Sequence, residues 1–484
     1  MITIGSLVLI VTLFWIFFKN SISRIFINLL TLTIFVELAI QRGYFIQIGE
    51  AQISYRTVCE LALTLVSVTY LITVSRTVDL RLFKQYMLAL GCLIIGWFLL
   101  ALFPSAARGG TYSVSWDQAL VGGVQLQNIQ FTPNMFVEMM QVIMFLIISI
   151  CAINSIKSDD WIDIYQRIIK FSRVYIYFCA IEFILINVFK SEFFRNTVDV
   201  ILGNSVATVT SLYTRQNRYV LCGLTKEPSH LAFTLAIIVL LNIGYLEYTK
   251  LSNEEIYKRI KNKIYFTNIL ALLFMMFSMS FSAYYFIGCI GLFWLVIFCC
   301  KHGIKGSSTI AYIGIIIVTL TIVIIFIPEI LSHMQINTFL GRRVISLFQE
   351  FSSAFSGNWS MITSSTLELS NKVRIGSTIE TLKLLRYRPL FGLGLTSVTA
   401  HSAFAMLLTG CGLIGTYFYL NMAFYIRTIK IVDYKKSMYL ICIFVYCFMN
   451  LFNSLALRPY YECWLLLVGV SFQFFTIDRE NNHH

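Results

Sequence analysis

Two arginines and a short polar segment precede a long apolar run in the stretch YTRQNRYVLCGLTKEPSHLAF, residues 213–233. Arg215 and Arg218 are three residues apart, a spacing that would bring them to one face of a helix. Guanidinium groups match phosphate oxygens through paired hydrogen bonds, so these residues could hold an anion. Contacts with solvent or with lipid headgroups are the alternative for both.

Glu227 stands at the end of this polar segment. Gly223 permits a turn, and Pro228 suits the first position of a helix, so a helix is expected to begin there. At that point a carboxylate can cap the helix and interact with the positive end of its dipole. It can also accept a proton as a general base. Both roles stay open, and His230 is a supporting candidate.

The segment 371–388 combines a helical pattern with further arginines. Its apolar residues recur at helical spacing, which predicts an amphipathic helix that lies on the outward-facing surface of the membrane. These residues are Val373, Ile379, Leu382 and Leu385. Arg386 and Arg388 flank Tyr387 just before Pro389 ends the helix.

Glycines and a histidine follow in residues 392–415. Gly392 and Gly394 allow a tight backbone path, and His401 lies at the mouth of the next apolar run, where it could be a helix cap or a catalyst. The glycines of that run are expected to mediate close helix packing rather than to bind phosphate. They are Gly410, Gly412 and Gly415.

By composition the chain is an integral membrane protein. Of its 484 residues, 58% are hydrophobic and 13% are charged, and the mean hydropathy is +0.76. These values lie outside the range that is typical of soluble globular domains. Apolar runs long enough to cross a bilayer recur about thirteen times, which predicts an all-α transmembrane bundle in a single domain, 1–484. The expected spans are 3–18, 24–41, 57–75, 85–103, 135–154, 174–190, 230–247, 264–281, 283–300, 309–328, 400–424, 437–456 and 462–477.

Short basic connections set the expected orientation. Placing residues 19–24 in the cytoplasm puts the other short basic connections on the same side, in accord with the positive-inside rule. They are 76–84, 157–173, 250–263, 301–305 and 427–436. The connections 104–134, 191–229 and 329–399 then face outward, away from ATP and nucleotide sugars. Synthesis there needs an activated substrate delivered by the membrane.

Other polar groups have simpler interpretations. The net charge of +13 does not indicate nucleic acid, because the basic residues are spread among short connections. Nearly all of the twelve cysteines lie in apolar runs, which predicts small core residues rather than disulfides or metal ligands. Glu182 is expected to face the bundle interior and to hydrogen-bond between helices. Three acids lie nearer the outer ends of their spans, where hydration is less costly; they are Glu37, Glu60 and Glu138.

The two motif regions resemble the bacterial O-antigen polymerase (Wzy) and O-antigen ligase superfamily. The resemblance lies in an arginine and a glycine before EPSHLA (227–232), then RYRPLFGLG (386–394) and HSAFAMLLTGCGLIG (401–415). The arrangement of spans and large outer loops is also similar over most of the chain. One departure is MSFSAYYFIG (279–288), where Ala283 stands in place of an arginine that relatives often carry.

The resemblance implies a fold like that of the GT-C-like membrane glycosyltransferases and a site at the outer face of the bacterial inner membrane. The implied reaction moves a growing glycan from undecaprenyl pyrophosphate to the non-reducing end of an incoming undecaprenyl-pyrophosphate-linked repeat unit. Ligation of glycan to a lipid A core is the alternative. The implied partners are the lipid-linked donor and acceptor, membrane lipids and a chain-length regulator protein, with no nucleic acid and no cofactor.

It also implies roles for individual residues. The pyrophosphate would be held by Arg215, Arg218, Arg374, Arg386 and Arg388, with Tyr387 and His230 in support. The catalytic candidates are His401, Glu227 and Arg218. Fixed guanidinium groups stabilise the negative charge that develops on a leaving pyrophosphate. The acceptor hydroxyl needs a base, and either His401 or Glu227 could serve.

Two alternatives concern metal use and transport. A divalent metal would need clustered carboxylates, but the outer loops contain no paired acids, and DDWID (159–163) lies on the cytoplasmic side. The expected transfer is therefore metal-independent. A polysaccharide flippase or secondary transporter is the alternative from another class, because intramembrane acids could couple to ions. Transporters commonly have two similar halves with broken helices, and the sequence shows no such repeat.

Overall fold

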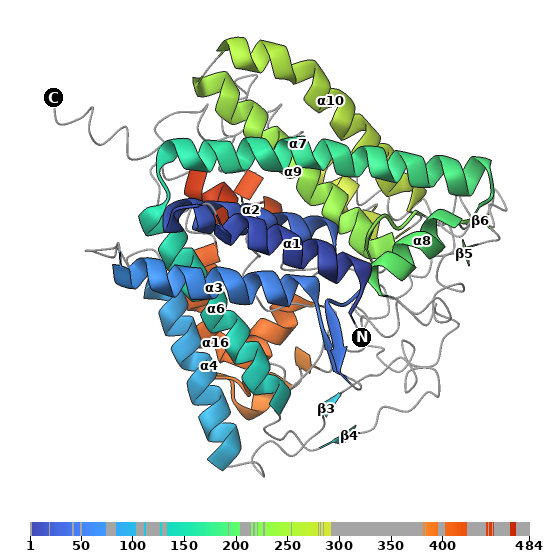
Figure 1. Cartoon of the computed structure of the whole chain (residues 1–484). Helices are drawn as coiled ribbons and strands as arrows, with labels where there is room; N and C mark the ends of the chain where they lie inside the picture. The colour runs from blue at the N-terminus through green and yellow to red at the C-terminus, as the bar shows by residue number, and fades with distance from the viewer. Residues whose placement is uncertain are drawn as a thin grey trace, which may run out of the picture.

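The protein is described by a computed structural model that is mainly helical (Figure 1). The described residues are 2–18, 20–40, 43–48, 51–73, 84–102, 111–112, 126–127, 133–191, 193–203, 214–215, 218–219, 221–225, 228–252, 254–278, 280, 282–283, 285–291, 381–382, 384–394, 402–423, 442–443, 445–447, 449 and 465–470. Structural statements below concern these residues.

Ten helices with named bounds account for most of this part of the chain. They are α1 (Ile4–Phe18), α2 (Ile22–Ala39), α3 (Tyr55–Thr73), α4 (Lys84–Leu102), α6 (Pro133–Ser155), α7 (Ser158–Phe183), α8 (Phe193–Leu202), α9 (Pro228–Ser252), α10 (Glu254–Phe277) and α16 (Ala403–Ala423). A π-helix, η2 (Ile184–Val188), extends α7, and a 3₁₀-helix, η5 (Leu384–Tyr387), precedes α16.

Three short antiparallel hairpins complete the described elements. They pair β1 (Ile46–Ile48) with β2 (Ala51–Ile53), β3 (Thr111–Tyr112) with β4 (Leu126–Gln127), and β5 (Thr214–Arg215) with β6 (Arg218–Tyr219).

In the described part of the chain, six helices are long and apolar enough to cross a membrane. They lie in α2, α3, α7 with η2, α9, α10 and α16, while α1, α4 and α6 contribute shorter apolar helices. The prediction of an all-helical membrane protein is confirmed at this level. These helices coincide with the first eight expected spans and with 400–424. The expected span 309–328 lies outside the described residues, and 283–300, 437–456 and 462–477 are described only in part.

Helix α9 is the central element of the bundle. It is buried along most of its length, and its neighbours are α7 and α10. Two polar contacts fix it among them: Asn242 Nδ2 donates to Asn268 Oδ1 of α10 at 2.6 Å, and the Tyr165 hydroxyl of α7 donates to the Leu241 carbonyl at 2.7 Å. In lipid the hydrophobic effect does not drive helices together, so interhelical hydrogen bonds of this kind help to hold the bundle together.

Several segments meet at one end of the bundle, which we call the hairpin end and define by β1–β2, α8 and β5–β6 (Figure 1). Thr3 Oγ1 lies 2.6 Å from the Tyr55 hydroxyl, which joins the starts of α1 and α3. The Tyr44 amide donates to the Leu202 carbonyl at 3.1 Å, which ties the chain after α2 to the end of α8. Of these segments, α8 and β5–β6 belong to the connection 191–229, which the positive-inside rule predicts to face outward.

Helix α7 includes most of the residues expected as the basic connection 157–173, while the side that they face stays a prediction. Residues 158–173 are helical, and DDWID lies in the first two turns. Asp159 and Asp160 suit the positive end of the helix dipole. Buried side chains at helical spacing lie in these turns and the next. Their burial stabilises this part of the helix despite the charged residues that lie between them in the sequence. The buried residues are Trp161, Ile164, Tyr165 and Ile168.

The outer segments also differ from expectation. Residues 191–229 were predicted as a loop, but they contain α8, whose buried face includes Val198 and Leu202. Of the amphipathic helix expected over 373–385, only its end is described: Thr381 and Leu382 are helical and η5 follows. Residues 371–380 lie outside the described part, so that prediction stays open.

Candidate functional site

Glu182 is the centre of a buried polar cluster at the hairpin end. Its side chain is 1% exposed, and the residue lies two positions before η2. Oε1 accepts from Arg195 Nε at 3.2 Å and from the Cys222 amide at 3.4 Å, and Oε2 accepts from the Gly223 amide at 2.6 Å. The prediction that Glu182 faces the interior is confirmed. Its partners, however, are helix α8 and the turn before α9 rather than another candidate span.

Arg195 balances the charge of Glu182. Its side chain is 4% exposed, so the two form an ion pair almost completely removed from solvent. Such a pair is tolerated only when both partners are present, because a single buried charge is costly. Helix α8 is fixed at its other end as well, where the Leu202 carbonyl accepts from the Tyr44 amide at 3.1 Å. The helix is thus held at both ends.

Arg215 and Arg218 do not lie on a helix. They are direct backbone partners in the β5–β6 hairpin, so they come opposite each other across two strands and not on one face of a helix. Strand β6 contacts η2, which places this hairpin beside the end of α7. Figure 1 shows both strands next to α8. The described residues include the backbone of both arginines but not their side chains.

The turn before α9 follows the sequence prediction. Gly223 has φ +60°, and α9 begins at Pro228. A side chain at 223 would meet the Tyr175 hydroxyl, because a Cβ there would lie 2.7 Å from it. His230 lies in the first turn of α9 and is half-buried. Glu227 lies outside the described residues, so neither its capping role nor its catalytic role is resolved.

Arg388 joins the second motif region to α4. Its Nη2 donates to the Leu99 carbonyl at 3.0 Å and its Nη1 to the Gly96 carbonyl at 3.4 Å. Leu99 is one of the last four residues of α4, whose carbonyl oxygens lack partners in the helix itself, and Gly96 lies three residues before it. At least two N–H groups of this guanidinium therefore donate to the backbone of α4.

A break in α16 receives the segment after Arg388. Gly412 is non-helical, with φ 68° and ψ −174°. Across this break, the Leu393 and Gly394 amides donate to the carbonyls of Thr409 and Gly410, and the Leu413 and Ile414 amides donate to those of Pro389 and Leu390. Non-helical backbone at membrane depth needs such internal partners.

The glycines at this junction are required by close backbone approach. A Cβ on Gly392 would lie 2.3 Å from the Gly410 carbonyl oxygen, and one on Gly412 would lie 2.3 Å from the Leu390 carbonyl. Gly415 packs against α4, since a Cβ there would lie 2.9 Å from Cys92 Cβ. Of the glycines expected to mediate close helix packing, Gly415 does so against α4, whereas Gly412 forms a break in α16 that was not foreseen.

Arg386 differs from Arg388 in its surroundings. It is exposed, its guanidinium lies 4.9 Å from the centre of the Tyr387 ring, and Nη2 donates to the Tyr387 hydroxyl at 2.8 Å. Stacking on an aromatic face orients a guanidinium while leaving its edge accessible. Arg374 and His401 lie outside the described residues. Their distances from the other candidates are therefore not part of the site described here.

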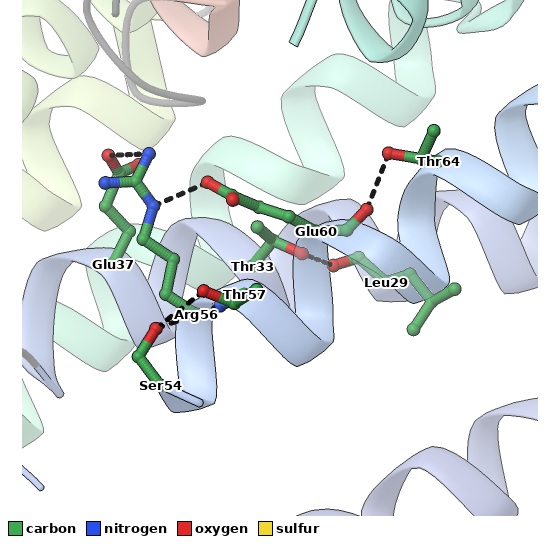
Figure 2. Close-up of polar contacts among 8 residues, drawn as sticks. All are labelled: Leu29, Thr33, Glu37, Ser54, Arg56, Thr57, Glu60 and Thr64. Atoms are coloured by element: carbon green, nitrogen blue, oxygen red, sulfur yellow. Dashed lines mark hydrogen bonds and ion pairs between the residues drawn. The ribbon is translucent and has the colours of Figure 1, made fainter. Parts of the chain in front are cut away.

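Sequence reasoning missed a second buried ion cluster at the hairpin end (Figure 2). Arg56 lies between two acids: its Nε is 2.6 Å from Glu60 Oε1, and its Nη2 is 3.6 Å from Glu37 Oε1. Glu37 and Glu60 are 7% and 4% exposed, so both are buried beside Arg56 although hydration is less costly near the end of a span. The i, i+4 spacing of Arg56 and Glu60 was an available signal.

The described cysteines and acids show no arrangement typical of a metal site or a disulfide. Nine cysteines are free, and eight of them are buried, in agreement with a packing role. No group of three or more metal-ligating side chains gathers within the described ranges.

Comparison with known proteins identifies no relative. Neither a family model, nor a curated protein, nor a solved structure matches the chain.

Proposed function

We propose that this protein is a polysaccharide polymerase of the bacterial inner membrane. It would transfer a growing glycan from undecaprenyl pyrophosphate to an incoming lipid-linked repeat unit on the outer side. The observation that carries the proposal is the direct cross-strand pairing of Arg215 with Arg218 at the hairpin end. Like charges directly opposite each other in a hairpin repel. A diphosphate bound between the two arginines would offset this repulsion, because each guanidinium group is attracted to its negative charge.

Arg386 provides the second support for a diphosphate site. It is exposed and oriented by Tyr387, so its guanidinium edge is accessible to a ligand. Arg388 would act mainly by fixing this segment to α4, since its bonds go to the carbonyls of Gly96 and Leu99. This division of roles refines the initial hypothesis, in which all five arginines contact the pyrophosphate.

The chemistry expected of the site is displacement at the anomeric carbon of the donor sugar. Bond cleavage develops negative charge on the lipid pyrophosphate, and preorganised guanidinium groups stabilise that charge more in the transition state than in the ground state. The acceptor hydroxyl loses its proton to a base, and Glu227 and His401 are the candidates. The transfer is proposed to need no metal.

A flippase or transporter is the second candidate function, and one observation favours it. Helix α16 is broken at Gly412, and broken helices commonly form the binding sites of transporters. Here the backbone groups at the break bond to residues 389–394, which gives the break a structural role instead. Ligation of glycan to lipid A core differs from polymerisation only in its acceptor.

Deletion of the gene from its host distinguishes these functions on one gel of surface glycan. Loss of a polymerase leaves glycan of a single repeat unit. Loss of a ligase removes all attached glycan, and loss of a flippase also prevents assembly on the outer side. Normal long-chain glycan in the deletion strain would refute all three.

A further inference from the structure

The buried carboxylate of Glu182 contacts a turn that connects two parts of the proposed site. Its partners Cys222 and Gly223 lie between β6, which carries Arg218, and the start of α9. The Leu221 amide also donates to the Phe277 carbonyl at the end of α10, at 3.5 Å. The turn is therefore held between the ends of α7 and α10, and Glu182 supplies its shortest bond.

The burial of Glu182 calls for a role beyond packing. A span is stable without a charged side chain, and an apolar pair in place of a buried ion pair is often neutral or stabilising. What an apolar side chain cannot do is accept the two backbone N–H groups of the turn. A carboxylate accepts several N–H donors at once and holds them through charge-assisted bonds.

We infer that Glu182 is a positioning residue: it holds the turn 221–223, and through it the β5–β6 hairpin with Arg215 and Arg218, against the end of α7. Arg195 makes this possible by neutralising the carboxylate in its buried position. The consequence for polysaccharide synthesis rests on the proposed function. The anchoring itself does not.

A pair of double variants isolates the hydrogen-bond acceptor from the ion pair. Glu182→Leu with Arg195→Met removes both charges and the acceptor, whereas Glu182→Gln with Arg195→Met removes both charges but keeps a carbonyl oxygen for the Gly223 amide. The two variants have side chains of similar size at position 182. Any difference between them therefore reports the acceptor rather than the loss of the ion pair.

The first readout is limited trypsin digestion of the detergent-solubilised protein, which does not depend on activity. We expect cleavage after Arg215 or Arg218 to be faster in the Leu/Met variant than in the Gln/Met variant by about fivefold, the ratio expected when one neutral hydrogen bond is lost. Equal cleavage rates in two folded variants would overturn the inference.

The second readout is polymer length in a deletion strain that carries each variant. We expect short glycan with the Leu/Met variant at normal membrane abundance, and restored length with the Gln/Met variant. If cleavage differs but wild-type protein itself makes no polymer, the proposed function fails and the anchor stands. If polymer length is equal in the two variants while cleavage differs, Glu182 anchors the turn without positioning the reaction.

Amide hydrogen exchange on the wild-type protein covers the case in which neither double variant folds. The amides of Cys222 and Gly223 should exchange far more slowly than those of an open turn, because both donate to a buried carboxylate. Exchange of these amides at the rate of an unprotected peptide would contradict the inference.

Discussion

Arg388 Nη2 donates to the carbonyl oxygen of Leu99 at 3.0 Å, a contact between residues 289 positions apart in the sequence. It connects the segment before α16 to the C-terminal end of α4. The same segment also bonds to both sides of the break in α16. Arg388 therefore contributes to the position of Arg386 and Tyr387, which precede it by two residues and one residue.

Substitutions of these two arginines should have different effects. Arg388→Ala removes the bonds to α4 and leaves its terminal carbonyls without these donors, so membrane abundance and thermal stability in detergent should both fall. Arg386→Ala changes an exposed residue, so abundance should be normal and polymer length should fall severely. Quantitative immunoblots and glycan gels on the same cells measure both. Equal abundance with normal polymer in both variants would contradict the two assigned roles.

The break in α16 should depend on glycine at position 412. Gly412→Ala introduces a Cβ 2.3 Å from the Leu390 carbonyl and forces a backbone conformation that is nearly restricted to glycine; we expect a loss of about 2 kcal/mol or more in stability. Gly91→Ala in α4 is the matched control, because nothing lies within 4 Å of the added carbon, and alanine favours a helix. Thermal denaturation in detergent compares the two variants. A Gly412→Ala variant as stable as wild type would argue against the break.

The packing of α16 on α4 can be tested through two native cysteines. A Cβ on Gly415 would lie 2.5 Å from Cys411 Cβ and 2.9 Å from Cys92 Cβ, so the two thiols are close neighbours. A short, membrane-permeant reagent that bridges thiols should link Cys92 to Cys411. Peptide mass spectrometry identifies the link, and Cys92→Ala is the control that must abolish it. Preferential linkage of Cys92 to a different cysteine would mean that the two helices are packed incorrectly.

Arg56 should be more important for stability than either acid beside it. Arg56→Met leaves the carboxylates of Glu37 and Glu60 buried together; breaking such a pair costs about 3–5 kcal/mol, and the 20% exposure of Arg56 favours the lower value. Combining Arg56→Met with Glu37→Gln and Glu60→Gln should recover most of the loss. Denaturation in detergent measures the series. A triple variant less stable than Arg56→Met alone would contradict a purely electrostatic cause.

The membrane-spanning helices and their order were largely predictable from the sequence. Apolar runs mark spans because each residue in lipid must be compatible with hydrocarbon, a local requirement that needs no knowledge of neighbours. The start of α9 at Pro228 and the turn at Gly223 were also predictable, because proline and glycine act through their own backbone.

The polar contacts at the hairpin end were not predictable in the same way. Glu182 meets Gly223, 41 residues along the chain, and Arg388 meets Leu99 through the packing of distant helices. A search for the partner of Glu182 could have begun with Arg195, the basic residue on the next helix. The cross-strand pairing of Arg215 with Arg218 depends on a hairpin too short to leave an alternating pattern.

The central claim is that this protein elongates a lipid-linked glycan by itself. Purified protein in nanodiscs, supplied with the undecaprenyl-pyrophosphate-linked repeat unit of its host and excess chelator, tests this claim most directly. Mass spectrometry of the extracted lipids should show a ladder of products that differ by one repeat unit, and Arg215→Ala with Arg218→Ala should abolish it. Contradiction would come from unextended substrate with folded wild-type protein, or from a ladder that both arginine substitutions leave unchanged.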